Sequence, residues 1–125
     1  MSEWWSPVLP IPSRPMNMND RASHWTRAKQ VRGWRTVGWT AGNMARPKPV
    51  IDGFAIYTLH LGVKSLKVRR DPSNLVPTSK AVCDGLTDAK FWIDDDSTRV
   101  RQEIPVITTD IPPNTFRIHI EWSNT

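Results

Sequence analysis

The sequence predicts a single α+β domain in which one mixed β-sheet packs with two main helices. Three observations support this fold class. The chain has 125 residues, enough for one hydrophobic core and too few for two independent ones. Two segments carry apolar residues at helical spacing, and several shorter ones have the alternation or the flanking turn residues of strands. Along the chain they follow as strand, helix, strand, helix and further strands, an order typical of α+β domains.

The first 50 residues predict a strand, a polar loop and a basic helix. Residues 6–11 read S-P-V-L-P-I, a short strand whose prolines confine it to a sheet edge. Residues 13–23 form a loop in which Asp20 or Ser23 can cap a helix over residues 24–44. The apolar face of that helix carries Val31, Trp34, Gly38 and Ala41, and the opposite face carries Lys29, Arg32 and Trp39. This second face is suited either to a phosphate backbone or to a partner subunit.

The rest of the chain predicts a central strand, a second helix and closing strands. Residues 54–61, F-A-I-Y-T-L-H-L, alternate between two faces, so we expect at least one face to be covered. Residues 65–70 are expected to form a short strand or the return of a hairpin. A helix over residues 76–89 has Val82, Leu86 and Ala89 on its apolar stripe, with Lys80 and Asp84 paired on the opposite face. Strands over residues 100–107 and 115–122 complete the sheet.

Positive charge is concentrated near the N-terminus. The net charge is +5, and residues 1–50 hold eight Lys or Arg against two acidic residues, whereas residues 51–125 hold nine against ten. A basic arm joined to a mixed-charge core is typical of a nucleic-acid binder that keeps its carboxylates for a metal ion. A solvated surface that keeps the protein in solution explains the same charges.

The sequence disfavours three classes of protein: membrane proteins, proteins stabilised by disulfides and zinc proteins. No apolar run approaches the roughly 20 residues that cross a bilayer, and the start M-S-E-W-W-S lacks the regions of a secretory signal. We therefore expect a soluble cytoplasmic protein without a membrane partner. Cys83 is the single cysteine, and no Cys/His cluster has zinc-ligand spacing. The scattered His24, His60 and His119 are expected to be structural or surface residues.

Residues 69–96 carry charges that hydrophobic packing does not explain. They read R-R-D-P-S-N-L-V-P-T-S-K-A-V-C-D-G-L-T-D-A-K-F-W-I-D-D-D. Carboxylates brought together beside cations suit a hard divalent metal acting on a phosphodiester. Ordinary structural roles also exist, since Asp71, Ser73 and Asn74 can each cap a helix.

The same segment resembles the core motif of RusA-family Holliday-junction resolvases of the phage and prophage type, approximately R-D-x-D-N-L-x-P-x-x-K-x-x-x-D-G-L-x-D-A-G-x-x-x-D-D. The runs R-D-P-S-N-L-V-P-T-S-K, C-D-G-L-T-D-A-K and W-I-D-D match it nearly position by position. The N-M-N-D-R run, the pair His24 and Trp25 and the basic helix also resemble phage-type members. Similarity thus covers most of the chain and implies a RusA-like fold.

The resemblance implies a homodimeric endonuclease that depends on Mg²⁺ or Mn²⁺ and uses no small-molecule cofactor. Such an enzyme binds four-way DNA junctions and nicks opposing strands symmetrically during recombination or repair. The family's metal site maps onto Asp71, Ser73 and Asp95, with Asp94 adjacent and Asn74 and Asp96 as supporting residues. A catalytic lysine maps to Lys80. The DNA backbone contacts that we expect are Arg69, Arg70, Lys29, Arg32 and Arg35.

One departure from the motif bears on catalysis. Ser73 stands where the family has its second aspartate, so a neutral hydroxyl replaces a charged ligand. Three explanations stay open: compensation by Asp94, Asp96 or water, an inactivated relative that keeps junction binding, or a deliberate substitution. From another class, an interaction protein on this scaffold would meet an acidic protein with its basic surface. The roles of Trp4 and Trp5, placed in a terminus that we expect to be flexible, stay unassigned.

Overall fold

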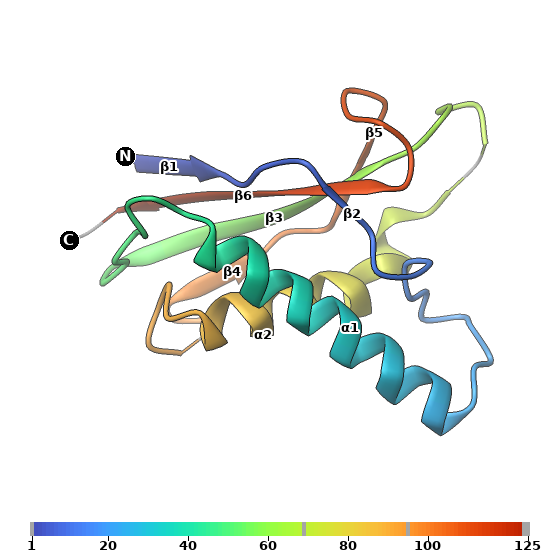
Figure 1. Cartoon of the computed structure of the whole chain (residues 1–125), viewed down its shortest axis with the longest axis horizontal. Coiled ribbons are helices and arrows are strands. Elements are labelled where there is room, and N and C mark those ends of the chain that lie inside the picture. The colour runs from blue at the N-terminus through green and yellow to red at the C-terminus, as the bar shows by residue number, and fades with distance from the viewer. Residues whose placement is uncertain (1, 69, 95, 124–125) are drawn as a thin grey trace.

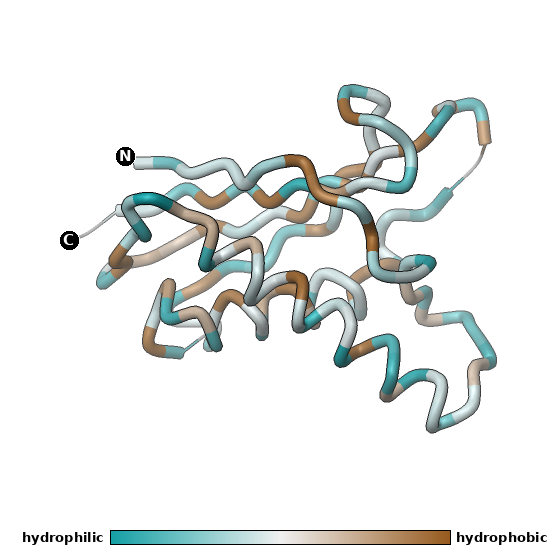
Figure 2. Tube along the Cα trace, in the orientation of Figure 1, coloured by the Kyte–Doolittle hydropathy of each residue, from teal (hydrophilic) through white to brown (hydrophobic). Residues whose placement is uncertain are grey.

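Two long antiparallel strands, β3 (Phe54–Gly62) and β6 (Thr115–Ser123), form the centre of the sheet in this computed structural model of the protein (Figure 1). The structure describes residues 2–68, 70–94 and 96–123. Both central strands lie where the sequence predicts them. Alternation along β3 is also as predicted, since Ala55, Tyr57, Leu59 and Leu61 are buried on the face that the helices cover. Hydropathy alternates visibly along these strands (Figure 2).

Shorter strands flank this pair and make the sheet mixed. On one side β1 (Ser2–Trp5) and β2 (Leu9–Pro10) pair antiparallel with β6, and on the other β4 (Val100–Gln102) and β5 (Val106–Thr108) pair parallel with β3. The predicted α+β class with one mixed sheet is confirmed. Two strand predictions were wrong in extent. Proline has no N–H for a ladder bond, so Pro7 restricts the strand predicted over residues 6–11 to Leu9–Pro10, and Pro105 divides the one predicted over residues 100–107.

The described part of residues 65–70 forms turns and bends instead of the predicted strand. There the Ser65 hydroxyl accepts a hydrogen bond from the Lys67 amide (3.1 Å), a local contact that replaces strand pairing. The N-terminus also differs from the expectation, because Trp4 and Trp5 belong to β1. Trp4 packs on Phe91 with ring centroids 4.9 Å apart, and Trp5 stacks on His119 at 4.0 Å.

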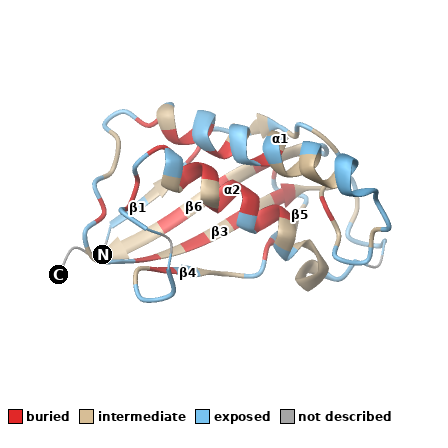
Figure 3. Ribbon diagram, turned by 90° about the horizontal axis from the view of Figure 1, so that it is seen from below, coloured by how far each residue is buried: buried red, intermediate tan, exposed pale blue. Residues whose placement is uncertain are grey.

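Two helices cover one face of the sheet. Helix α1 (His24–Asn43) begins after Ser23, whose hydroxyl accepts from the Thr26 amide (3.1 Å), as predicted for this cap. Helix α2 (Val76–Asp88) follows a single turn of 3-10 helix, η1 (Pro72–Leu75). Buried residues line the faces of α1 and α2 that meet each other and the sheet (Figure 3). The predicted stripes are confirmed, with Trp34, Gly38 and Ala41 buried in α1 and Val82 and Leu86 in α2.

The helices cross at two glycines. A Cβ on Gly85 would overlap the Arg35 carbonyl oxygen and lie 2.7 Å from the Trp39 amide nitrogen. A Cβ on Gly38 would overlap the Val82 carbonyl oxygen. Each glycine thus allows the backbone of one helix to approach that of the other, and the short distance between the helices depends on both.

Tyr57 is expected to ionise only when the protein unfolds. It is the one tyrosine of the chain, it is buried, and its hydroxyl donates to the Ser79 carbonyl oxygen (2.9 Å). Burial first, and Cys83 second, raise its pKa well above the ordinary value of about 10. Its contribution to stability is therefore complete below about pH 10 and is lost as the pH rises towards the folded pKa. In an alkaline titration, tyrosinate absorbance should appear together with loss of circular dichroism. Tyrosinate in a chain with native dichroism would contradict this.

Candidate functional site

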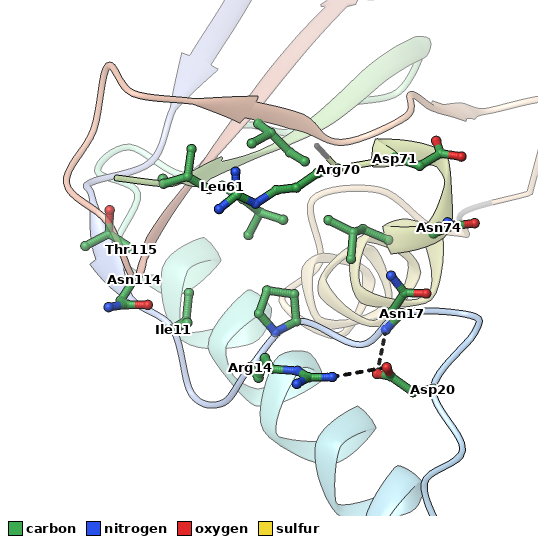
Figure 4. A pocket seen from close by; sticks show the side chains of 15 residues that line it. Ile11, Arg14, Asn17, Asp20, Leu61, Arg70, Asp71, Asn74, Asn114 and Thr115 are labelled. Atoms are coloured by element: carbon green, nitrogen blue, oxygen red, sulfur yellow. Dashed lines mark hydrogen bonds and ion pairs between the residues drawn. The ribbon is translucent and has the colours of Figure 1, made fainter. Parts of the chain in front are cut away.

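A cleft of about 490 Å³ opens where β3 ends, between the N-terminal loop and the residues around η1 (Figure 4). Apolar side chains form part of its lining, among them Ile11, Leu61, Leu75 and Ile107. Polar and charged residues complete it: Arg14, Asn17, Asp20, Arg70, Asp71, Asn74, Asn114 and Thr115. Three residues of the predicted site, Arg70, Asp71 and Asn74, are thus brought together here.

Asp71 caps η1 and holds Ser73 beside it. Its Oδ1 accepts hydrogen bonds from the Ser73 amide (3.1 Å) and from the Ser73 hydroxyl (2.6 Å). The extended conformation at Asp71 and the proline that follows it produce this turn locally. Asp71 thus caps the 3-10 turn and not the predicted second helix, since α2 begins after Leu75 without a side-chain cap. Ser73, at the position of the missing aspartate, therefore donates to the carboxylate of Asp71 and adds no negative charge.

Two arginines supply the positive charge of the cleft. Arg70 reaches across it towards Leu61, while Asp71 and Asn74 lie at its outer edge (Figure 4). One Arg70 nitrogen, Nη1, donates to the carbonyl oxygens of Ser65 (2.9 Å) and Val68 (3.3 Å), which anchors the guanidinium in the cleft. On the opposite side Arg14 is largely exposed and pairs with Asp20 at 3.2 Å.

The N-terminal loop contributes residues that the sequence did not assign to a site, among them Asp20, which was a candidate helix cap until the structure gave that role to Ser23. Asp20 fixes the loop by accepting from the Asn17 amide (3.1 Å) as well as from Arg14. The loop is held against the second helix because the buried Thr78 hydroxyl donates to the Met16 carbonyl oxygen (2.9 Å). Only the polar N-M-N-D-R run indicated that this loop matters, and the run by itself does not reveal which residues face η1.

Lys80 lies outside the set of residues that line the cleft. Its side chain is 63% exposed, and Nζ lies 3.6 Å from Asp84 Oδ1, the pairing predicted from their spacing of four residues. It projects from the outer surface of α2, and its catalytic role stays a prediction.

The aspartates that close residues 69–96 are separated from Asp71 by α2. Asp71 precedes η1 and α2, whereas Asp94 and Asp96 follow the end of α2, and the Asp96 carbonyl oxygen accepts from the Val100 amide at the start of β4 (3.0 Å). At about 1.5 Å per residue, the 13 residues of α2 span about 20 Å. Asp95 and Arg69 lie outside the described residues. Within one chain, Asp94 and Asp96 are therefore not brought to the cleft.

Asp96 has a local structural role. Its carboxylate accepts from the Thr98 amide (2.8 Å) and from the Thr98 hydroxyl. These hydrogen bonds lower its pKa. Asp94 is exposed. In the described ranges, no three side chains of His, Cys, Asp or Glu lie close enough together to hold a metal ion.

The outer face of α1 carries the predicted cations. Lys29 and Arg32 are exposed, and Trp25 (81% exposed) and Trp39 lie on the same surface. Arg35 differs, because its Nε and Nη2 bind the carboxylate of Asp88 at 2.6 and 2.9 Å and so link α1 to α2. This contact lowers the pKa of Asp88.

If the exposed cations of α1 bind a phosphate backbone, as the sequence predicts, Lys29 and Arg32 should contribute more to that binding than Arg35 does. Each released phosphate counterion contributes about one unit to the slope of log affinity against log salt. Lys29→Ala and Arg32→Ala should each reduce that slope by about one unit, and Arg35→Ala by less, since Asp88 already neutralises its guanidinium. Fluorescence anisotropy with a labelled four-way junction over a range of salt concentrations measures the slopes. Equal losses for all three variants would contradict the difference assigned to Arg35.

Among the described residues, no helix is long and apolar enough to cross a membrane. The sequence matches no protein-family model, and no curated protein matches it.

Proposed function

We propose that the chain is a Mg²⁺-dependent, structure-specific endonuclease that binds four-way DNA junctions and nicks them symmetrically in the cytoplasm of a bacterial cell, as a phage or prophage protein. The proposal rests on the resemblance of residues 69–96 to RusA-family resolvases. The observation that carries it is the capped turn at Asp71, which stands beside Arg70 and Asn74 at the edge of a cleft. A carboxylate at the edge of a cleft that also holds guanidinium groups suits metal-assisted attack on a phosphodiester.

The oxygen donors at η1 agree in type with Mg²⁺. This ion takes hard oxygen ligands, keeps several waters and is commonly held by one or two carboxylates. Around η1 the donors are the carboxylate of Asp71 and the neutral side-chain oxygens of Ser73 and Asn74. A largely hydrated Mg²⁺ fits such a set, and its low negative charge predicts weak affinity.

In this proposal Asp71 holds the metal ion, with Asn74 as a neighbouring donor. The chemistry that a bound divalent ion supplies is activation of water and stabilisation of the leaving 3′ oxygen. Arg70, anchored by two carbonyl oxygens, orients the phosphodiester and offsets its charge. Arg14 faces the same cleft and extends the phosphate-binding surface. Lys29 and Arg32 attract the flanking DNA from the outer face of α1.

A second candidate is a protein that binds branched DNA without cutting it. The hydrogen bonds that Ser73 donates to Asp71 favour this alternative, because they occupy the carboxylate without adding a negative ligand. So does the separation of Asp94 and Asp96 from Asp71 by the length of α2. In this case the same arginines and lysine would still recognise the junction.

Cleavage by the native chain and by Ser73→Asp decides between the candidates. A four-way junction is incubated with each protein and Mg²⁺ or Mn²⁺, and nicks are mapped on all four strands. We expect Ser73→Asp to cut faster by about tenfold or more, because a second carboxylate raises metal occupancy. Ser73→Asn, of similar size without the charge, is the matched control and should not be faster than the native chain.

Each outcome has a distinct meaning. Paired nicks made only by Ser73→Asp would identify the native chain as a binder. Equal cleavage by both would show that Ser73 does not limit the reaction. If neither protein prefers the junction over linear duplex of the same sequence, both candidates fail.

A further inference from the structure

The outer side of α1 carries a continuous stripe of exposed residues. Residues separated by four and three positions share one face of a helix, and Trp25, Lys29, Arg32, Thr36 and Trp39 follow this spacing. All five are exposed, Trp25 by 81% and Trp39 by 48%. Exposed residues recur along the whole length of the helix (Figure 3). This α1 stripe thus has a tryptophan at each end and two cations between them.

The positive charge of the α1 stripe is not neutralised within the described residues. Helix α1 contains four Lys or Arg among its 20 residues and no Asp or Glu. Arg35, beside the stripe, is paired with Asp88, but in the described ranges no carboxylate forms an ion pair with Lys29 or Arg32. The stripe is therefore complementary in charge to a polyanion.

Two open hollows flank the middle of the stripe, and Arg32 and Thr36 line both of them. One, of about 240 Å³, lies between Trp39 and α2. The other, of about 690 Å³, extends from Lys29 to Pro12 in the N-terminal loop. The outer surface of α1 is thus hollowed on both sides of its cations, which gives recesses to groups that project from the backbone of a polyanion.

The tryptophans indicate that this polyanion is an unpaired nucleic-acid strand. They leave large apolar surfaces in water, and covering such surfaces is favourable. A duplex presents its phosphates to the cations but keeps its bases stacked on one another, so it leaves the rings without a partner. An unpaired strand supplies both contacts, because every base has a face that stacks on an aromatic ring. A membrane surface fits less well, since the apolar face of α1 is buried and is not free to insert.

The length of the stripe sets the size of the site. Trp25 and Trp39 are about four helical turns apart, which corresponds to about 21 Å along the axis of α1. A stacked strand advances about 3.4 Å per nucleotide. About six nucleotides therefore connect the two tryptophans, and their phosphates pass Lys29 and Arg32.

We propose that the α1 stripe binds an unpaired DNA strand, with bases stacked on Trp25 and Trp39 and phosphates held by Lys29 and Arg32. The site is separate from the cleft at η1, because the residues that line the cleft and those that line the two hollows do not overlap. As a site for single strands it depends on α1 alone. Its role on a branched substrate rests on the proposed function, and there it predicts a preference for branches that carry an unpaired segment.

Alanine variants separate stacking from charge. Fluorescence anisotropy without metal gives the affinities of the native chain and its variants for a labelled oligothymidylate and for a linear duplex. We expect Trp25→Ala and Trp39→Ala each to bind the oligothymidylate about tenfold more weakly, with little change in duplex affinity. Lys29→Ala should weaken the binding of both. Phe54→Ala, which removes a 41% exposed ring from β3, is the matched control and should bind as the native chain does.

Two conservative variants test whether Trp39 acts through its ring. Trp39→Phe keeps an aromatic face and should retain most of the affinity, whereas Trp39→Leu keeps only apolar surface and should lose as much as Trp39→Ala. The thermal midpoints of both should stay close to the native value, because the side chain is exposed. Native affinity should rise with oligonucleotide length up to about six nucleotides and then level off.

Three results would overturn the proposal. The first is a native chain that does not bind oligothymidylate, and the second is an affinity that no tryptophan variant alters or that falls equally for duplex. The third is equally tight binding of polyglutamate with the same loss in Trp39→Leu, which would assign the stripe to an acidic protein. None of these measurements uses a junction or a divalent metal, so this site and the proposed function can fail separately.

Discussion

Asp71→Asn is expected to lower junction cleavage by on the order of 100-fold. The substitution keeps the size of the side chain and one acceptor oxygen but removes the negative charge that holds a divalent ion. Changes outside the ligand shell of a metal site already cost about 10-fold to 100-fold. The rate should be measured as a function of Mg²⁺ concentration, in whichever background cleaves, the native chain or Ser73→Asp.

Retention of the fold makes this loss interpretable. Asparagine caps helices about as well as aspartate, so the turn that holds Ser73 and the thermal midpoint should change little. Junction affinity without metal should be equal or slightly higher, because a negative charge has been removed from a phosphate-binding cleft. Asp110→Asn, at an exposed position outside the cleft, is the matched control. Undiminished cleavage by Asp71→Asn would remove this residue from the proposed mechanism.

Gly85→Ala is expected to destabilise the protein by about 3 kcal/mol. The intrinsic preference of helices favours alanine over glycine by about 1 kcal/mol. At this position the added methyl overlaps backbone atoms of Arg35 and Trp39, so α1 and α2 must move apart and their packed side chains lose contact. Overpacking of this kind costs about 1–3 kcal/mol or more, and backbone atoms cannot rotate away as a side chain can. Denaturant unfolding followed by circular dichroism measures the change.

Gly33 supplies the control within the same helix pair. A Cβ there would meet Pro12 at 3.7 Å, an ordinary van der Waals distance. Gly33→Ala should therefore be neutral or stabilise the protein by up to about 1 kcal/mol. Equal effects of the two substitutions would show that the fold does not need glycine at position 85 for the close approach of the helices.

The spacing of apolar residues predicts the helices and strands that bury the same side along their whole length. The alternating β3 and the amphipathic α1 and α2 all lie within a few residues of their predicted positions, because each buries one side against the core. The errors occur where single residues interrupt that repetition. Pro7 and Pro105 each remove a ladder hydrogen bond, and Ser65 replaces pairing with a local turn. The strand β1 was missed because its pairing partner, β6, lies at the other end of the chain.

The candidate site is less predictable because it depends on distances between elements. The cap at Asp71 and the pairing of Lys80 with Asp84 are local and follow from spacing. Proximity in sequence does not reveal that Asp94 lies beyond the far end of α2 from Asp71, since a helix between two residues separates them by its whole length. Arg14 enters the cleft through a loop whose path is set by the contact between Met16 and Thr78, about 60 residues apart in sequence.

The pairing of β1 with β6 constrains when the protein can fold during synthesis. Ser2 lies opposite Trp122, and the Ser6 amide donates to the Ile118 carbonyl oxygen (2.9 Å). Strand β6 is thus the neighbour of β1 as well as of β3, and it is synthesised after both of them. Contacts so distant in sequence slow folding, because the chain must close a long loop before they form. The sheet is therefore completed only once residues 115–123 have been synthesised, and until then β3 lacks its antiparallel neighbour.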